Sequence, residues 1–515
     1  MAEEKKSRLY ALKPVIERWP AVTKPEGHVH FRTKIIWTVL CLIIYFILTN
    51  IIIFGLKGQV LDMFAGFRAI MAGASGSIMH LGIGPIVTAS IILQLFVGAK
   101  IIKLDLTKKE DKAIYQGTQK VLVIVMILVE AIPQVYGYLS PSDSLIGMVG
   151  GGWANAVIIS QLFMGAFLVF LMDELISKWG IGSGISLFIA AGVSQAIFTG
   201  LFNWLPFDST LPLSISNPPS GAIPGTYYLT SQMSLGEIVE GGYQILFIGH
   251  QGFQNAIVPL IGTIAIFLIV VYTESSRIEL PLAHGKVRGA RGRYPIRLIY
   301  ASNIPVILMA ALLANINMFA LLFYTHPTMS KLPLVGQQWW IGAYNTAGGS
   351  TAPTMGGAWY LSNLNGINGW LMPMLAGGIP GGHAAWQYAL KVIIYLSVMI
   401  FGSILFAKFW IETTDMGPKA VARQIQSSGM QIPGFRRDPR VLGRVLERYI
   451  PVVTIIGGAA VGALAGFADA IGTVGNASGT GLLLTVGIMI NLYEQIAREQ
   501  AMEMHPVLRG FFGAE

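Results

Sequence analysis

The chain has 515 residues, of which 53% are hydrophobic and only 12% charged, with a formal net charge of +9. Soluble globular proteins carry about one quarter charged residues, so this composition excludes an ordinary soluble protein and predicts an integral membrane protein. The single cysteine, Cys41, lies in an apolar run, which excludes a disulfide within the chain. We expect no cleavable signal peptide, because residues 1–34 are polar and mixed in charge.

Ten stretches are long and apolar enough to cross a bilayer, which takes roughly 17–25 mainly apolar residues. We expect each to be a helix, because an isolated strand cannot satisfy its backbone hydrogen bonds in lipid. The predicted fold is therefore an all-α membrane protein with ten transmembrane helices. In chain order the spans lie at about 35–56, 81–99, 117–138, 153–172, 184–204, 256–274, 298–323, 388–408, 451–469 and 477–493.

The segment between the first two spans, 59–79, is too short and too broken to cross the membrane, yet too apolar for a simple loop. Within it, Leu61–Ala72 is predicted to form a short helix that ends at the following Gly-Ala-Ser-Gly run. Such a helix either lies on the membrane surface or folds back into the protein as a re-entrant element. The residues alone leave both alternatives open.

Two spans carry helix-breaking residues near one end. In 81–99 these are Gly82 and Pro85, and in 298–323 they form the group Asn303-Ile-Pro305. Proline removes a backbone donor and disturbs a helix interior, so a membrane span keeps such residues only where its surroundings compensate. Interrupted spans at matching places in two halves of a membrane protein indicate a transport path.

The spans divide into a first half, 35–204, and a second half, 256–493, with five in each. Because five is an odd number, the halves cross the membrane in opposite directions, as in an inverted repeat. The two interrupted spans then occupy the second place in their halves. We predict that the N-terminal segment 1–34 and the tail 494–515 both lie in the cytosol.

Basic residues set this orientation. With the N-terminus in the cytosol, all but four of the 35 Lys and Arg residues fall on the cytosolic side, as the positive-inside rule requires. The long segments 205–255 and 324–387 are then external and contain one basic residue, Lys331. We interpret them as a structural cap. The loops 274–297 and 409–450 are cytosolic, and the predicted location is the cell (plasma) membrane.

These two cytosolic loops are rich in arginine and longer than the topology needs. Either the positive-inside rule alone explains their charge, or the loops bind phosphate, which arginine holds bidentately. The basic residues considered are Arg277, Lys286, Arg288, Arg291 and Arg293 in the first loop, with Arg436 and Arg437 in the second.

No catalytic or nucleotide-binding motif stands out, so we expect neither an enzyme nor a bound cofactor or metal. Mid-membrane positions are mostly Ile, Val and Leu, with Glu130 almost alone as a carboxyl group inside a span. A channel fits this pattern best. A secondary transporter for a small solute needs several polar residues at mid-membrane, and a membrane scaffold that only recruits ribosomes needs no interrupted spans.

Four blocks of the chain, in order, carry a specific resemblance. They read LGIGPIVTASIILQLFVGAKII at 81–102, DELISKWGIGSGISLFI at 173–189, ESSRIELPL at 274–282 with RYPIRLIYASNIPVIL at 293–308, and QIPGFRRDPR at 431–440. On these blocks the chain resembles the SecY family, the large subunit of the protein-conducting channel, in its archaeal and eukaryotic form. Its segments 205–255 and 324–387 are longer than family members usually carry, so the resemblance implies nothing about them.

The resemblance implies the central subunit of a protein translocation channel. Such a channel passes unfolded secretory polypeptides across the membrane and releases apolar segments sideways into lipid through a lateral gate. It is a passive pore that is driven by its partners. The implied partners are a SecE-type clamp subunit, a small beta subunit, the ribosome bound through RNA phosphates at the cytosolic loops, signal peptides, nascent chains and membrane lipids.

The resemblance also implies roles for individual residues. A mid-membrane pore ring of aliphatic side chains falls on Ile83, Val87, Ile185, Ile189, Ile307 and Leu484. A plug beneath this ring, at about 61–72, includes Leu61, Phe64, Ala65, Gly66, Arg68, Ala69 and Ala72. The lateral gate is expected to contain the polar residues Thr88, Glu130, Asn303 and Asn315.

Overall fold

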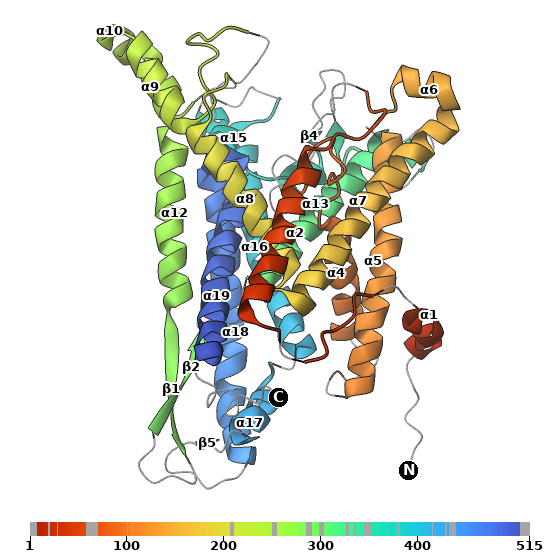
Figure 1. The fold of residues 1–515 in the computed structure, drawn as a ribbon. Helices are drawn as coiled ribbons and strands as arrows, with labels where there is room; N and C mark the ends of the chain where they lie inside the picture. The colour runs from red at the N-terminus through yellow and green to blue at the C-terminus, as the bar shows by residue number, and fades with distance from the viewer. Residues whose placement is uncertain are drawn as a thin grey trace.

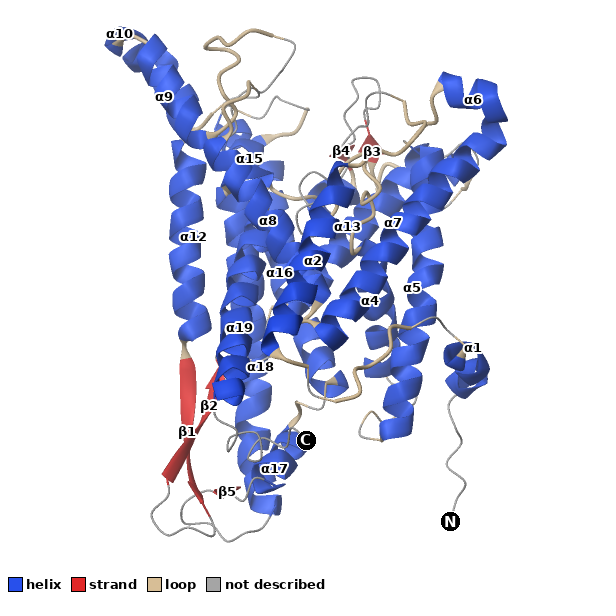
Figure 2. Ribbon diagram, viewed as in Figure 1, coloured by secondary structure: helices blue, strands red, loops and turns tan. Residues whose placement is uncertain are grey.

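The computed structural model consists mainly of long helices that run alongside one another as a bundle (Figures 1 and 2). It describes residues 8–18, 21–27, 29–57, 71–99, 101–102, 104, 106, 108–137, 139–206, 211–249, 255–284, 291–297, 303–325, 329–333, 336–344, 352–375, 377, 382–414, 416–427, 430–431 and 439–504. Among these residues, nine helices are long and apolar enough to cross a membrane, and a tenth apolar helix is shorter. The prediction of a helical membrane protein is confirmed.

The helices of the bundle follow the predicted spans, with some shifted ends. In the first half they are α2 (Phe31–Asn50), α4 (Gly84–Gly98), α5 (Lys109–Gly137), α7 (Gly151–Trp179) and α8 (Gly184–Phe202). In the second half they are α12 (Ile257–Ser275), α13 (Ile304–Thr325), α16 (Ala385–Thr413), α18 (Pro439–Ile471) and α19 (Gly479–Met504). Helices α18 and α19 extend well beyond the apolar stretches from which their spans were predicted.

The short helix α4 begins late because of the predicted interruption. Gly82 has a φ of +54°, and a Cβ at this position would lie 2.1 Å from the carbonyl oxygen of Met71. Only glycine fits such a left-handed, crowded position. Pro85 stands in the first turn of the helix, where its missing N–H is not needed. The interruption therefore sets the start of α4 rather than kinking a longer helix.

The second half is held together by a stripe of small residues between α18 and α16. Gly458, Gly462 and Gly466 are spaced four apart on α18, and a Cβ on each would touch α16 at 3.1, 2.6 and 2.6 Å respectively. Small residues at this spacing let two helix backbones approach closely, which is how membrane helices gain packing energy. The two helices therefore form one tightly packed unit.

The predicted cytosolic loops contain short strands. Strand β1 (Arg277–His284) pairs with β2 (Arg291–Arg297) as an antiparallel hairpin, and β5 (Met430–Gln431) joins the other edge of β1. The hairpin continues directly from the end of α12 and projects from one end of the bundle beside α17 (Pro418–Ser427) (Figure 1). The short helices α1 (Lys13–Glu17) and η1 (Arg8–Leu12) precede the bundle in the chain.

The opposite end of the bundle carries the remaining short elements (Figure 2). They are α6 (Asp143–Val149), α9 (Ala222–Gln232), α10 (Leu235–Glu237), η2 (Ile238–Gly242), α11 (Tyr243–Phe247), η3 (Met329–Lys331), β3 (Ala343–Tyr344), β4 (Pro353–Met355), α14 (Gly357–Leu361), α15 (Ile367–Leu375) and η5 (Val474–Asn476). Strands β3 and β4 pair antiparallel.

Segment 324–387 is anchored to α16 through an aromatic group around a buried lysine. The Lys391 ammonium lies 4.8 Å from the centre of the Trp359 ring, and Trp359 stacks on His383 with ring centres 3.9 Å apart. A lysine inside a membrane helix needs such a partner. The described part of this segment thus packs on the bundle.

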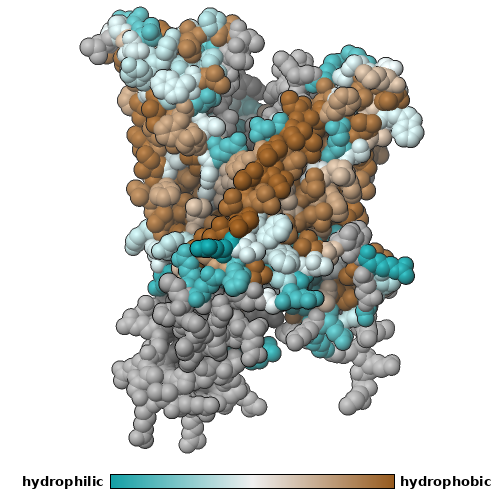
Figure 3. Space-filling view, viewed as in Figure 1, coloured by the Kyte–Doolittle hydropathy of each residue, from teal (hydrophilic) through white to brown (hydrophobic). Residues whose placement is uncertain are grey.

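The surface of the bundle is apolar across its middle. Figure 3 shows brown residues over the centre of the visible face, with more hydrophilic residues toward both ends. On α2, Ile36, Ile43 and Ile47 are exposed by 64%, 50% and 55%. Large exposed aliphatic side chains over such a wide area are favourable against lipid and not against water.

Candidate functional site

Three buried polar side chains join the two halves of the bundle. The Thr88 hydroxyl on α4 donates to Glu130 Oε1 on α5 at 2.8 Å and accepts from Asn315 Nδ2 on α13 at 2.9 Å. All three side chains are at most 7% exposed. Gly84 makes room for this contact, since a Cβ there would lie 3.0 Å from Glu130 Oε2. The structure thus brings three of the four predicted gate residues together.

The same seam continues above and below the polar group. On one side of it, Gln134 Nε2 of α5 donates to Met318 Sδ of α13 at 3.5 Å. On the other side, the end of α4 meets α16, and a Cβ on Gly98 would lie only 2.6 Å from the ring of Phe409. Helices α4 and α5 therefore face α13 and α16 along a closed seam between the first and the second half.

Asn303, the fourth predicted gate residue, does not join this group. It lies just before α13, next to Glu274 at the end of α12 and to Gly487 on α19, where a Cβ would be 1.8 Å from Asn303 Nδ2. Both Asn303 and Glu274 are buried. The asparagine therefore belongs to the junction of α12, α13 and α19.

The predicted pore-ring residues come from four helices that meet in one hydrophobic core. Five of the six side chains are buried within it, and Ile185, which is half-buried, packs against it. Helix α4 packs on α13, α8 packs on α19, and α13 contacts α19. The six residues are Ile83 and Val87 near α4, Ile185 and Ile189 on α8, Ile307 on α13 and Leu484 on α19.

Most of the predicted plug lies outside the described residues. This applies to Leu61, Phe64, Ala65, Gly66, Arg68 and Ala69. Its last residue, Ala72, is buried, and its carbonyl oxygen accepts a hydrogen bond of 2.9 Å from the Tyr45 hydroxyl. The neighbouring Met71 carbonyl accepts from the backbone N–H of Ile83 at 2.8 Å. The last residues of the predicted plug therefore touch the first pore-ring residue directly.

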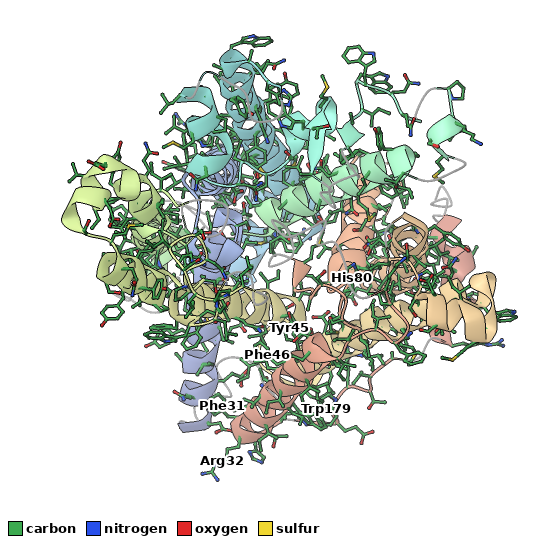
Figure 4. All side chains as sticks on the ribbon, turned by 90° about the horizontal axis from the view of Figure 1, so that it is seen from above. Phe31, Arg32, Tyr45, Phe46, His80 and Trp179 are labelled. Atoms are coloured by element: carbon green, nitrogen blue, oxygen red, sulfur yellow. The ribbon has the colours of Figure 1, made fainter. Side chains whose placement is uncertain are left out.

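Tyr45 and His80, both labelled in Figure 4, hold this connecting segment in place. Tyr45 of α2 stacks on Phe188 of α8 with ring centres 4.9 Å apart. His80 Nδ1 accepts a hydrogen bond of 3.0 Å from the backbone N–H of Gly76. Residues 71–83 are thus fixed both to the wall of the first half and to themselves.

Of the seven predicted docking residues, Arg277 alone has a described side chain, and it is exposed. Arg291 and Arg293 lie on β2, while Lys286, Arg288, Arg436 and Arg437 lie outside the described residues. At the base of the hairpin, where Arg277 pairs in register with Arg297, both arginines contact Glu494 of α19.

Sequence reasoning missed Glu494 and the seam residues Gln134, Met318, Gly98 and Phe409. Glu494 stands in a polar tail, and the others look like ordinary span residues. Within the described part of the chain, no group of three or more His, Cys, Asp or Glu side chains is placed to hold a metal ion.

The fold and this seam define a class of protein: a helical membrane protein in two halves that meet through a few buried polar contacts. Comparison with known proteins agrees. The SecY family model matches residues 77–493, and a second model, the plug domain of Sec61p, matches residues 43–76. The chain is 46% identical over 517 residues to the protein translocase subunit SecY of Archaeoglobus fulgidus, with 99% of each chain covered.

Solved structures are similar over nearly the whole length. One, described as the structure of a protein-conducting channel, is 38% identical with a TM-score of 0.75, covering 96% of this chain and 98% of that one. Another, Sec61 in the canine ribosome-channel complex from the endoplasmic reticulum, is also 38% identical, with the same coverage and a TM-score of 0.72. The chain belongs to the SecY family. It is a subunit of a protein-translocation channel and not an enzyme.

Proposed function

We propose that the six aliphatic residues Ile83, Val87, Ile185, Ile189, Ile307 and Leu484 form the constriction through which an unfolded polypeptide passes. Their common place in one core, contributed by four helices from both halves, supports this proposal. An apolar constriction has no fixed charge to trap a substrate, and it dewets when empty, which holds back ions. The plug, at about 61–72, closes the constriction from the external side.

The observation that carries the proposal is the hydrogen-bonded group Thr88, Glu130 and Asn315 between the halves. We infer that it is the latch of a lateral gate. An intramolecular hydrogen bond contributes about 0.5–1.5 kcal/mol net, so the two bonds of the latch hold the seam shut yet remain breakable. Each Leu of an entering apolar segment gains roughly 0.3–0.6 kcal/mol in lipid, so a segment of sufficient length offsets the loss of the latch.

The pore is passive and depends on partners. We expect a SecE-type subunit that clamps the two halves and a small beta subunit. We also expect the ribosome to bind the hairpin and the loop 409–450 through RNA phosphates. The ribosome-bound state of the similar canine Sec61 structure supports this expectation, as do the arginines of β1 and β2. Signal peptides, nascent chains and lipids are the remaining contacts.

The proposed orientation places both termini, the hairpin and α17 in the cytosol. The chain then spans the cell membrane many times, and segments 205–255 and 324–387 lie outside. The hairpin and the short helices of those two segments lie at opposite ends of the bundle (Figure 1), which fits this arrangement. It is tested by the accessibility of single cysteines to an impermeant reagent in intact cells, in a Cys41→Ala background.

Ion leak through proteoliposomes tests the constriction. Ile83→Ser and Ile189→Ser each place a hydroxyl in the proposed ring, so they should raise the leak of the resting channel several-fold. Ile264→Ser is the matched control, because Ile264 lies on the outward face of α12 and is 54% exposed. Equal leak in all three variants would mean that the seal lies elsewhere.

A further inference from the structure

The last turns of α19 carry acidic residues on two opposite faces. Glu499 and Glu503 are four residues apart and share one face of the helix, whereas Glu494 lies roughly 140–180° away from them at about 100° per residue. We call residues 491–504 the α19 extension. Its two acidic faces contact different parts of the molecule.

One face holds the base of the β1–β2 hairpin. Arg277 Nη2 lies 3.0 Å from Glu494 Oε1, and Arg297 binds Glu494 Oε2. Arg297 Nη1 also donates to Asn491 Oδ1 at 2.7 Å. The arginine side chains remain 44% and 28% exposed, so another anion can approach them from solvent. A single carboxylate thus occupies the two arginines that close the hairpin.

The other face holds the start of α2, in the first half of the chain. Lys34 Nζ lies 2.8 Å from Glu499 Oε1, and the backbone N–H of Phe31 donates to Glu503 Oε1 at 2.6 Å. Phe31 is the first residue of α2, where backbone N–H groups lack helical partners and favour a negative charge. Phe31 and Arg32, labelled in Figure 4, mark this end of α2.

We propose that the α19 extension is an electrostatic strap that ties the hairpin to α2, and that RNA phosphates release it by taking Arg277 and Arg297 from Glu494. This inference rests on the proposed ribosome docking and adds its regulation. Phosphate accepts from arginine in the same bidentate geometry as a carboxylate. The same donors cannot serve both anions fully, so docking and the strap compete.

Competition for Glu494 can affect the pore because the strap is part of a helix that lines the proposed constriction. Helix α19 also carries Leu484 of the proposed constriction, ten residues and therefore about 15 Å before Glu494. The extension crosses between halves, since α2 belongs to the first and α19 to the second. A ribosome that frees Glu494 thus loosens a connection on the helix that lines the pore.

Ribosome binding by purified full-length protein in nanodiscs tests the competition, with archaeal ribosomes as the probe. Glu494→Gln removes the internal competitor and keeps the side-chain shape. It should bind about two- to tenfold more tightly than the wild type. Glu240→Gln is the matched control, with the same charge change at an exposed position of η2 at the other end of the bundle, and should bind within about twofold of the wild type. Equal affinity of Glu494→Gln and wild type overturns the strap and leaves docking intact. Failure of the wild type to bind overturns docking and the strap together.

The distance between the hairpin and α2 shows directly whether the strap is formed or released. Spin labels on Ser275→Cys, beside the hairpin, and Arg32→Cys, on α2, report on the connection in a Cys41→Ala background. Ribosomes should shift the distance distribution to longer values in the otherwise unaltered protein. Glu494→Gln should show part of that shift without ribosomes, whereas Lys391→Met, at the other end of the bundle, should show none. An unchanged distribution in ribosome-bound protein contradicts the proposal.

Discussion

Two helix interfaces that both involve the second half of the chain are built in opposite ways. Between α16 and α18 the contact is a dry stripe of Gly458, Gly462 and Gly466, with backbones in close approach. Between α4 and α5 on one side and α13 and α16 on the other, apolar packing is interrupted by buried hydrogen bonds at Thr88 and Gln134, and Gly98 meets Phe409 closely at one end.

This difference separates the parts that stay together from the parts that move. Close packing of small residues makes many short-range contacts, all of which are lost on separation, so the α16–α18 unit behaves as a rigid body. A few hydrogen bonds can exchange partners with water or with a passing chain and form again. We infer that opening occurs at the polar seam and leaves the glycine stripe intact.

The largest effect is expected at the glycine stripe. Gly462→Leu should prevent α16 and α18 from packing, because even a Cβ would lie 2.6 Å from the Met399 carbonyl oxygen. Overpacking typically destabilises by about 1–3 kcal/mol, and we expect Gly462→Leu to reach or exceed the upper end of that range, because backbone contacts cannot yield as a flexible side chain does. Thermal unfolding in detergent measures the loss. Gly152→Leu, at the exposed start of α7 with open space around it, should remain close to the wild type.

The next largest effect is expected at the latch. Glu130→Leu removes the carboxylate that Thr88 donates to, so opening should become easier by about 1–3 kcal/mol. Less apolar signal sequences should then be accepted by the channel in proteoliposomes. Glu130→Gln keeps an acceptor for Thr88, so its acceptance of weak signal sequences should lie between that of the wild type and that of Glu130→Leu. Unchanged selection in Glu130→Leu would remove the latch from the account.

A smaller effect is expected where the seam ends. Gly98→Ala should press against Phe409 and loosen the seam by roughly 1 kcal/mol. Because the Phe409 ring is the obstacle, Phe409→Ala should make room for the new methyl group. The double variant Gly98→Ala/Phe409→Ala should therefore be less perturbed than the sum of the two single variants. Gating by signals of graded hydrophobicity measures all three variants. Strictly additive effects would show that the two residues do not meet at the seam.

The smallest effect is expected at Gln134. Its amide donates to the thioether of Met318, which is a weak acceptor. Gln134→Leu should therefore change signal selection by no more than about 0.5 kcal/mol. If Gln134→Leu changed signal selection as much as Glu130→Leu does, Gln134 and Met318 would have to be counted as part of the latch.

Much of this arrangement can be predicted from the sequence, because single residues within a span are informative without knowledge of their partners. Gly82 and Pro85 set the start of α4, and a carboxyl group inside a span, Glu130, marks a polar contact before its partners are known. The hairpin was not predicted, although Ile278, Leu280 and Leu282 alternate along β1, because each strand contains a proline and the stretch was interpreted as a basic loop. Glu494 was missed because its partners lie 197 and 217 residues away in the chain, and an isolated glutamate in a polar tail resembles any solvated charge.

The central claim is that a translocating chain passes through the aliphatic ring. A photo-reactive residue placed singly at Ile83, Ile189 and Ile307 tests it with a secretory chain stalled in the channel. We predict that all three positions cross-link to the stalled chain, whereas Ile264 on the outward face of α12 cross-links only to lipid or to other subunits. Cross-linking of the stalled chain at Ile264 but not at the three ring positions would contradict the account.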